Sequence, residues 1–327
     1  MKKRLGDYLL AFIIILALIF LLPRLMPGDP ITAIYGDALV EMSPEMEAHL
    51  VERYGLDLPL GQQFLVFLGN LLQGDLGYSF YFQAPVAQVL GEALPWTLLL
   101  AGISLVISAL LGVLWGVEAG WRRGKKFDRI SLVTALFLNG IPGFLLGILL
   151  LLGLGYYGQW FPISGGVSPY LTPGAGTWHW MVDALRHFVL PAMTLTLAQL
   201  PRNFLLMRSS LLGVVREPYV MTARGKGIKE RFIRYRHCLR GALPPVVVRL
   251  GMSAGLLFTG VLFVEVVFAY PGLGHLFYLA LQHHDYPTVH GCLLTITLCV
   301  LLFNLLADLS SMKLDPRLKE DAHKLLG

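Results

Sequence analysis

The chain has 327 residues, 55% of them hydrophobic and only 14% charged, and a mean hydropathy of +0.64. This composition is too apolar for an average soluble protein and indicates an integral membrane protein. The net charge of +5 would suit a nucleic-acid partner, but the cations lie between long apolar runs, where membrane orientation explains them. Three cysteines without CxxC spacing, Cys238, Cys292 and Cys299, argue against a disulfide framework and a zinc site.

The N-terminal part is predicted to be one membrane span followed by an extracytoplasmic segment. Residues 1–26 begin with three cations and continue as a long apolar run without a cleavage site, which indicates an uncleaved transmembrane helix. Residues 27–94 hold nine acidic residues, which suits the outer side. Within this segment, apolar residues at helical spacing predict a short helix packed on the outer surface of the membrane part; they are Phe64, Phe67, Leu68, Leu71 and Leu72.

Residues 95–312 are predicted to form a core of five further transmembrane helices, which gives an all-α protein with six spans. The five spans are expected near residues 95–117, 130–157, 187–212, 246–269 and 288–309, before a tail over residues 313–327. Pro142 is expected to kink the third span of the chain, near residues 130–157, and Pro191 and Pro201 are expected to break the fourth span, near residues 187–212. Pro271 and two glycines are expected to end the fifth span, near residues 246–269.

The 26 cations of the chain are distributed unevenly over this map. Of these, 21 lie in four places: before the first span, directly after the second, between Arg208 and Arg240, and in the tail. Because short loops rich in Lys and Arg face the cytoplasm, this asymmetry predicts that both termini are cytoplasmic.

The loop over residues 213–245 is the most cationic of these stretches and is therefore expected in the cytoplasm. Pro218 suits the first position of a short helix, and Gly225 and Gly227 mark a bend after it. Beyond the bend, apolar residues at helical spacing predict an amphipathic helix; they are Ile228, Phe232, Tyr235 and Leu239. Small residues around the bend would let another protein approach the backbone closely. An ordinary basic loop between two spans is the alternative.

No enzyme site is recognisable in the sequence. Residues 120–126 have neither the spacing of a P-loop nor the hydroxyl residue that would hold Mg²⁺, and HExxH and GxSxG motifs are missing. The chain is therefore expected to be non-catalytic by itself.

Ionisable residues in or near the spans leave two other functions open. Histidines in the last outer loop could bind a transition metal, although no carboxylate or cysteine keeps ligand spacing with them; they are His275, His283, His284 and His290. Glu265 or Asp308 could couple transport to an ion gradient, but both lie near the ends of their spans, where a structural role is the alternative. Arg202 could pair with one of these carboxylates.

Short motifs follow one another along nearly the whole chain. In the N-terminal part they are Gly28-Asp29-Pro30, Tyr54-Gly55-Leu56-Asp57 with Pro59-Leu60, and Gly74-Asp75-Leu76-Gly77 with Ser79. Further on they are Tyr219-Val220-Met221-Thr222-Ala223-Arg224-Gly225-Lys226-Gly227, Arg236-His237, Leu243-Pro244-Pro245, Tyr270-Pro271-Gly272-Leu273-Gly274, Asp285-Tyr286-Pro287 and Leu314-Asp315-Pro316-Arg317. Together they resemble the first of the two permease subunits of ABC importers for dipeptides, oligopeptides and nickel. Met221, Gly225 and Pro244 depart from that pattern and leave the subfamily open.

The resemblance implies a multi-pass permease of a bacterial or archaeal plasma membrane that works with other proteins. The implied partners are a second permease subunit, two ATPase subunits that carry ATP and Mg²⁺, an extracytoplasmic solute-binding protein and membrane lipid, with no nucleic acid and no cofactor on this chain. Residues 218–224 would be a coupling helix seated in a groove of an ATPase subunit. The implied coupling residues are Pro218, Tyr219, Thr222, Ala223, Arg224, Gly225 and Gly227, and the implied residues of the translocation path are Pro142, Pro191, Pro201, Arg202 and Glu265.

The predicted function is thus a permease subunit that couples ATPase closure to the import of dipeptides or oligopeptides. Import of nickel or a metal chelate by the same architecture is one alternative. An ion-coupled secondary transporter is another, and it predicts inverted repeats, of which the sequence shows no sign.

Overall fold

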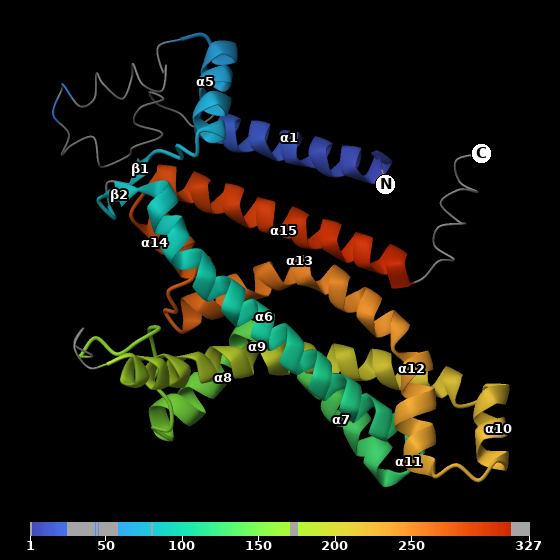
Figure 1. Cartoon of the computed structure of the whole chain (residues 1–327). Coiled ribbons are helices and arrows are strands. Elements are labelled where there is room, and N and C mark those ends of the chain that lie inside the picture. The colour runs from blue at the N-terminus through green and yellow to red at the C-terminus, as the bar shows by residue number, and fades with distance from the viewer. Residues whose placement is uncertain are drawn as a thin grey trace. The chain divides into compact units, whose positions relative to one another are not determined.

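The computed structural model describes residues 2–24, 43, 45, 58–79, 81–170 and 176–314, with the backbone alone at 2–5, 22–24, 252–259 and 307–314 (Figure 1). The described chain is almost entirely helical. It divides into two compact units: unit 1 comprises Met1–Leu98 and Pro271–Leu301, and unit 2 comprises Leu99–Tyr270 and Leu302–Gly327. The motifs at residues 28–30, 54–57 and 315–317 and the side chain of Asp308 lie outside the described part.

The predicted outer helix is present in unit 1 and packs on the N-terminal helix. Helix α1 covers Lys2–Arg24, and α5 covers Leu60–Leu72. Phe20 of α1 meets Phe64 of α5 edge to face, with 5.1 Å between ring centroids. This contact buries apolar surface that isolated short helices would leave in water. Leu72 is an exception to the predicted stripe, because 89% of its surface is exposed.

The rest of unit 1 joins a small hairpin to helices from both ends of the chain. Strands β1 (Tyr78–Ser79) and β2 (Ala84–Pro85) pair antiparallel, and α14 (Leu273–Gln282) precedes α15 (Tyr286–Leu314). The Ser79 hydroxyl donates to Oδ2 of Asp285 at 2.5 Å, and Thr288 donates to the same oxygen at 2.7 Å. Two of the sequence motifs, 206 positions apart, therefore meet at one buried carboxylate.

Unit 2 contains most of the helical core. Its elements are the later part of α6 (Val86–Trp121), α7 (Lys126–Asn139), α8 (Gly143–Leu150), the π-helix η1 (Leu151–Tyr157), α9 (Thr177–Val214), α10 (Pro218–Gly225), α11 (Glu230–Phe232), the π-helix η2 (Ile233–Cys238), α12 (Leu239–Ala242) and α13 (Pro244–Val267) (Figure 1). Helix α13 agrees with the predicted fifth span, and Pro271 and Gly272 follow its end, as expected.

Helices α6 and α9 approach each other at backbone contact. A Cβ atom placed on Gly112 would lie 2.6 Å from the Cβ of Asn203, and one on Gly116 would lie 2.8 Å from the carbonyl oxygen of Phe204. Gly120 continues this row, one turn further along α6. Only glycine permits such proximity, because any side chain here would overlap backbone atoms of the neighbouring helix.

The prediction that Pro191 and Pro201 break the fourth span is wrong. Helix α9 continues through both prolines for 38 residues. A proline in a helix interior costs about 3 kcal/mol, whereas burying one large apolar side chain stabilises by about 1.5 to 3 kcal/mol. Because α9 buries Leu190, Leu195 and Phe204 among other side chains, packing outweighs both lost hydrogen bonds. For the same reason α6 contains Pro95 and begins at Val86, before the predicted boundary.

The predicted third span is sharply bent. Helix α7 and the α8–η1 segment meet at an angle of 99°. Pro142 lies at the break with φ −57° and ψ 140°, so it initiates α8 instead of continuing α7. The predicted kink is therefore confirmed, and it is close to a right angle.

Length and composition identify fewer membrane spans than the six predicted. Within the described residues, Val86–Trp121 and Tyr286–Leu306 are long and apolar enough to cross a membrane, and the bent pair would make a third. The described apolar part of α1, Gly6–Leu21, is shorter. The number six and the cytoplasmic placement of both termini remain predictions.

The close approach of α6 to α9 predicts that Gly116→Ala destabilises the protein, because the added methyl group would overlap the Phe204 carbonyl oxygen. Overpacking of this kind costs about 1 to 3 kcal/mol, so we expect a clear loss of thermal stability in detergent, measured by size-exclusion chromatography after heating. Gly102→Ala is the matched control, since nothing lies within 4 Å of its added Cβ. Equal melting of the two variants would contradict the predicted contact.

Candidate functional site

The short helix predicted over residues 218–224 is present as α10, and each end has a clear physical cause. Pro218 opens the helix after the extended residue Glu217, where its missing N–H is not needed. At the other end, Gly227 adopts a left-handed conformation with φ +72°. The N–H of Gly227 donates to the Arg224 carbonyl at 2.9 Å, and the N–H of Ile228 donates to the Ala223 carbonyl at 3.3 Å. These two bonds form a Schellman motif, which stops the helix.

The two glycines at the bend have different roles. Gly227 is needed for its conformation, because a residue with a side chain is strained at this φ. Gly225 is the last helical residue, its φ is not positive, and nothing lies within 4 Å of an added Cβ. Gly225 therefore leaves the surface open without being required by the backbone.

Helix α10 has one buried and one exposed face. Val220 is fully buried and Ala223 is 6% exposed, and both join a core cluster that also contains Val117, Met207, Leu211, Ile233, Cys238, Ala242 and Val246. The exposed residues of α10 and the following bend are Pro218, Tyr219, Met221, Thr222, Arg224, Gly225, Lys226 and Gly227. The structure thus places Ala223 inside, where it anchors the helix, and adds Met221 to the outer face.

Tyr219 links α10 to α12 although its ring is 45% exposed. Its hydroxyl lies 2.6 Å from the position of a Cβ on Gly241, so the ring lies across this glycine. Partial burial raises the pKa of the Tyr219 phenol above its ordinary value. The phenol is therefore neutral at physiological pH and can present a hydrogen-bonding edge to a partner.

The segment after the bend is helical, and three residues of the predicted stripe, Ile228, Tyr235 and Leu239, pack against the same core cluster. Ile233, Cys238 and Ala242 are fully buried, whereas Phe232 is 54% exposed. The cause is η2, because a π-helix bonds i to i+5 and moves the inward positions away from α-helical spacing. The prediction is therefore wrong for Phe232. Burial also raises the pKa of the Cys238 thiol.

Two arginines of the loop flank the last residue of α6. The guanidinium carbon of Arg224 lies 5.4 Å from the centre of the Trp121 ring, and that of Arg234 lies 5.1 Å from it. Arg224 also pairs with Glu230 at 3.2 Å across the bend. Cation–π contacts and an exposed ion pair each contribute about 1 kcal/mol or less. Together they fix the orientation of α10 relative to α6 more than they add stability.

Glu118, one turn before Trp121, gathers three partners from the same region. It accepts hydrogen bonds from Arg234 and from the Tyr235 hydroxyl, both at 2.5 Å, and it pairs with Arg122 at 3.0 Å. Partial burial and the bond to Glu118 raise the pKa of Tyr235, so this phenol remains a donor. This carboxylate was not identified from the sequence, because Arg234 and Tyr235 lie more than 100 positions away from it.

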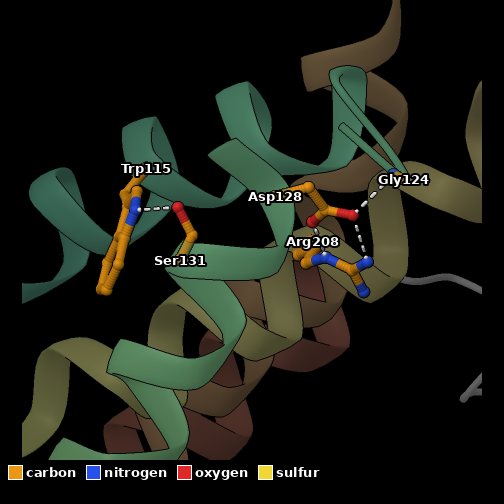
Figure 2. Close-up of polar contacts among 5 residues, drawn as sticks. All are labelled: Trp115, Gly124, Asp128, Ser131 and Arg208. Atoms are coloured by element: carbon orange, nitrogen blue, oxygen red, sulfur yellow. Dashed lines mark hydrogen bonds and ion pairs between the residues drawn. The ribbon is translucent and has the colours of Figure 1, made fainter. Parts of the chain in front are cut away.

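A second buried ion pair ties α7 to α9. Asp128, which is 2% exposed, accepts a bidentate contact from Arg208, with Nε to Oδ1 at 2.6 Å and Nη2 to Oδ2 at 2.9 Å. The Gly124 N–H donates to the same carboxylate at 2.9 Å (Figure 2). Figure 2 also shows the Trp115 indole N–H donating to the Ser131 hydroxyl, which joins α6 to α7.

The residues predicted for the translocation path do not form one open surface in this chain. Pro191 and Pro201 are buried in α9, Glu265 is fully buried in α13, and Pro142 is exposed at the bend. Arg202 is exposed and donates to the side-chain oxygen of Asn139 at 3.4 Å. Within the described residues Arg202 makes no ion pair, so its predicted pairing with Glu265 is not observed, and the side chain of Asp308 lies outside the described part.

The histidines of the predicted outer loop do not gather into a metal-binding group in the part of the chain that the structure describes. Among the described residues, no group of three or more His, Cys, Asp or Glu side chains could hold a metal ion. His283 instead stacks on Tyr81, with 3.9 Å between ring centres. Burial lowers the pKa of His275, which favours its neutral form.

Comparison with known proteins agrees with the motifs. Residues 108–320 match the family described as binding-protein-dependent transport system inner membrane component. A Brucella suis biovar 1 protein classed as a peptide permease is 39% identical over 303 residues, which is 92% of this chain and 93% of that protein. The dipeptide transport system permease protein of Escherichia coli K12 is 34% identical, and the di/tripeptide transport system permease protein of Pseudomonas aeruginosa is 33% identical. Each of these covers 332 aligned residues and 97% of both chains.

The buried pair between α7 and α9 predicts a strong coupling of Asp128 and Arg208. Asp128→Asn or Arg208→Gln alone should destabilise the protein by about 3 to 5 kcal/mol, since each leaves a buried charge unpaired. The double variant should lose clearly less than the sum of the two. Melting temperatures of the four proteins in one detergent measure this, and additive losses would contradict the pair.

Proposed function

Since the chain belongs to the family of binding-protein-dependent transport system inner membrane components, we propose that it is the permease subunit of an ATP-driven importer of short peptides. The motifs first read from the sequence agree with this family. Relatives named for peptide, dipeptide and di/tripeptide transport support the substrate class. We infer six spans with both termini in the cytoplasm, which the distribution of cations supports.

The observation that carries the proposal is the two-faced helix α10. Its inner face packs on residues of three long helices, Val117 of α6, Leu211 of α9 and Val246 of α13. Its outer face is free within the described chain, with exposed side chains and an open backbone at Gly225. A helix held rigidly from one side and open on the other suits docking into a groove on an ATPase subunit.

The proposed mechanism is mechanical. When two ATPase subunits close on ATP and Mg²⁺, α10 is carried with the subunit that holds it. Because Val220 and Ala223 are locked into the core cluster, the movement passes to α6, α9 and α13 together. A second, different permease subunit completes the translocation path, and an extracytoplasmic binding protein delivers the peptide. This chain supplies no catalytic group.

The two alternatives are less well supported. A nickel importer is not favoured, because the similar proteins are named for peptides and the described histidines belong to no group of three or more possible metal ligands. An ion-coupled transporter would need Glu265 or Asp308 as a coupling site, and the side chain of Asp308 lies outside the described part. Glu265 is buried in unit 2, and the family depends on a binding protein instead.

We expect Gly227→Asp to abolish ATP-driven peptide uptake while leaving membrane insertion intact, because the left-handed residue that ends α10 would be lost. The complex with its ATPase subunits and binding protein is reconstituted in liposomes, and uptake of a labelled dipeptide is measured. Gly213→Ala is the matched control and should retain uptake, since this residue lies in α9 outside the coupling residues and nothing lies within 4 Å of an added Cβ. Normal uptake by Gly227→Asp would refute the coupling role of this bend.

The two faces of α10 also predict a site-specific cross-linking pattern. With the native cysteines replaced by alanine, Met221→Cys should cross-link to an ATPase subunit, because Met221 is 67% exposed on the outer face. Val220→Cys, one residue earlier and fully buried, should not react. Electrophoresis of the purified complex after treatment with a short bifunctional thiol reagent measures both. Cross-linking of neither variant to an ATPase subunit would count against the proposed docking face.

A further inference from the structure

A pocket lies beside the coupling helix and is not used by the proposed mechanism. We call it the Glu118 pocket. It has a volume of about 640 Å³ and is lined by Leu114, Glu118, Arg231, Arg234 and Tyr235. This volume is in the range of small-ligand sites. All five residues belong to unit 2, and they come from α6 and from the segment that follows α10.

The pocket carries more positive than negative charge. Glu118 is its one carboxylate, and it is already paired with Arg234 and Arg122. Arg231 is exposed and makes no ion pair within the part of the chain that the structure describes. The Nε of Arg234 is buried and has no hydrogen-bond partner among the described residues. An unpaired guanidinium and a buried, unused donor are the groups that bind a phosphate.

An apolar track leads along α6 to the pocket. Leu110 is 60% exposed, and Leu111 and Leu114 are each 48% exposed. These residues share one helix face with Glu118, at spacings of three, four and seven positions. The exposed leucines therefore end where the charged groups begin. This order of apolar surface and then cations matches an amphipathic ligand that lies parallel to the helix.

We propose that the Glu118 pocket binds the phosphate headgroup of an anionic phospholipid, with Arg231 and Arg234 as its ligands and an acyl chain along Leu110, Leu111 and Leu114. The proposal rests on the proposed function only in placing this end of α6 at the cytoplasmic surface. The bound phosphate joins the segment after α10 to α6. Anionic lipid therefore stabilises the arrangement of helices through which the coupling movement passes.

The leucine track distinguishes a lipid from other anions. Free phosphate or an acidic side chain of a partner would satisfy the two arginines but would leave the track unused. A phospholipid contacts both the arginines and the leucine track. Such a bound phospholipid would hold a fixed position in place of the mobile lipids that otherwise contact these leucines. The negative surface of the cytoplasmic leaflet also concentrates such lipids near cations.

The test counts the lipid bound to the purified complex. The complete complex in detergent is mixed with phosphatidylglycerol or, separately, phosphatidylcholine, and native mass spectrometry measures the retained lipid. Arg231→Gln should lower retention of phosphatidylglycerol about fivefold, the loss expected for one surface cation. Arg236→Gln is the matched control, because it removes the same charge from an exposed position of the same segment outside the pocket. Phosphatidylcholine should be retained weakly by all variants.

Leu114→Gln separates a lipid from a free anion. It should lower retention of phosphatidylglycerol while leaving both arginines in place. If Arg231→Gln lowers retention but Leu114→Gln does not, or if inorganic phosphate displaces the lipid, the pocket is a site for free anions and the proposal is overturned. Equal retention by the Arg231→Gln and Arg236→Gln variants also overturns it. The measurement needs neither ATP nor peptide, so its outcome is independent of whether the complex imports peptides.

Discussion

The arrangement of unit 2 depends on the contact of α6 with α9 at backbone distance. Gly112, Gly116 and Gly120 permit this approach, and the residues that they meet on α9 extend to Leu211. Leu211 belongs to the core cluster that holds the inner face of α10. The position of α10 is therefore set by glycines more than 90 residues earlier in the chain. A side chain at these positions would move α9 outward and take with it the surface on which α10 is seated.

Buried charged side chains fix the orientation of the packed helices relative to one another. Asp128 and Arg208 form a bidentate pair at the edge of the same contact, and bidentate geometry fixes orientation as well as distance. Glu118 of α6 likewise fixes the orientation of η2, because it accepts a hydrogen bond from Arg234. The exposed pair of Arg224 and Glu230 contributes little energy by comparison. A few of the charged residues in this region thus determine how helices are registered against one another.

The sequence predicted the features that are encoded locally. Pro218 and the bend at Gly227 gave the start and end of α10, and the apolar spacing of Phe64 and Phe67 gave α5. It did not predict the continuity of α9 through Pro191 and Pro201, because that depends on burial along the whole helix. It also missed Glu118 and Asp128 as sites of pairing, since a carboxylate next to a cationic loop is ordinary until the fold brings Arg234 or Arg208 to it. The inward position of Ala223 and the outward position of Phe232 followed from helix packing and π-helical spacing, which residue types alone do not reveal.

The π-helix η2 has a consequence for the chain between its two fixed ends. One end is held by the Schellman motif of α10, and the other continues through α12 into α13. A π-helical turn contains more residues than an α-helical turn, because its hydrogen bonds join residues five positions apart instead of four. Residues 233–238 therefore span a shorter length along the helix axis than the same residues would span in an α-helix. Converting them to α-helical geometry would lengthen the connection between α10 and α13 without stretching any covalent bond, so this connection can change its length.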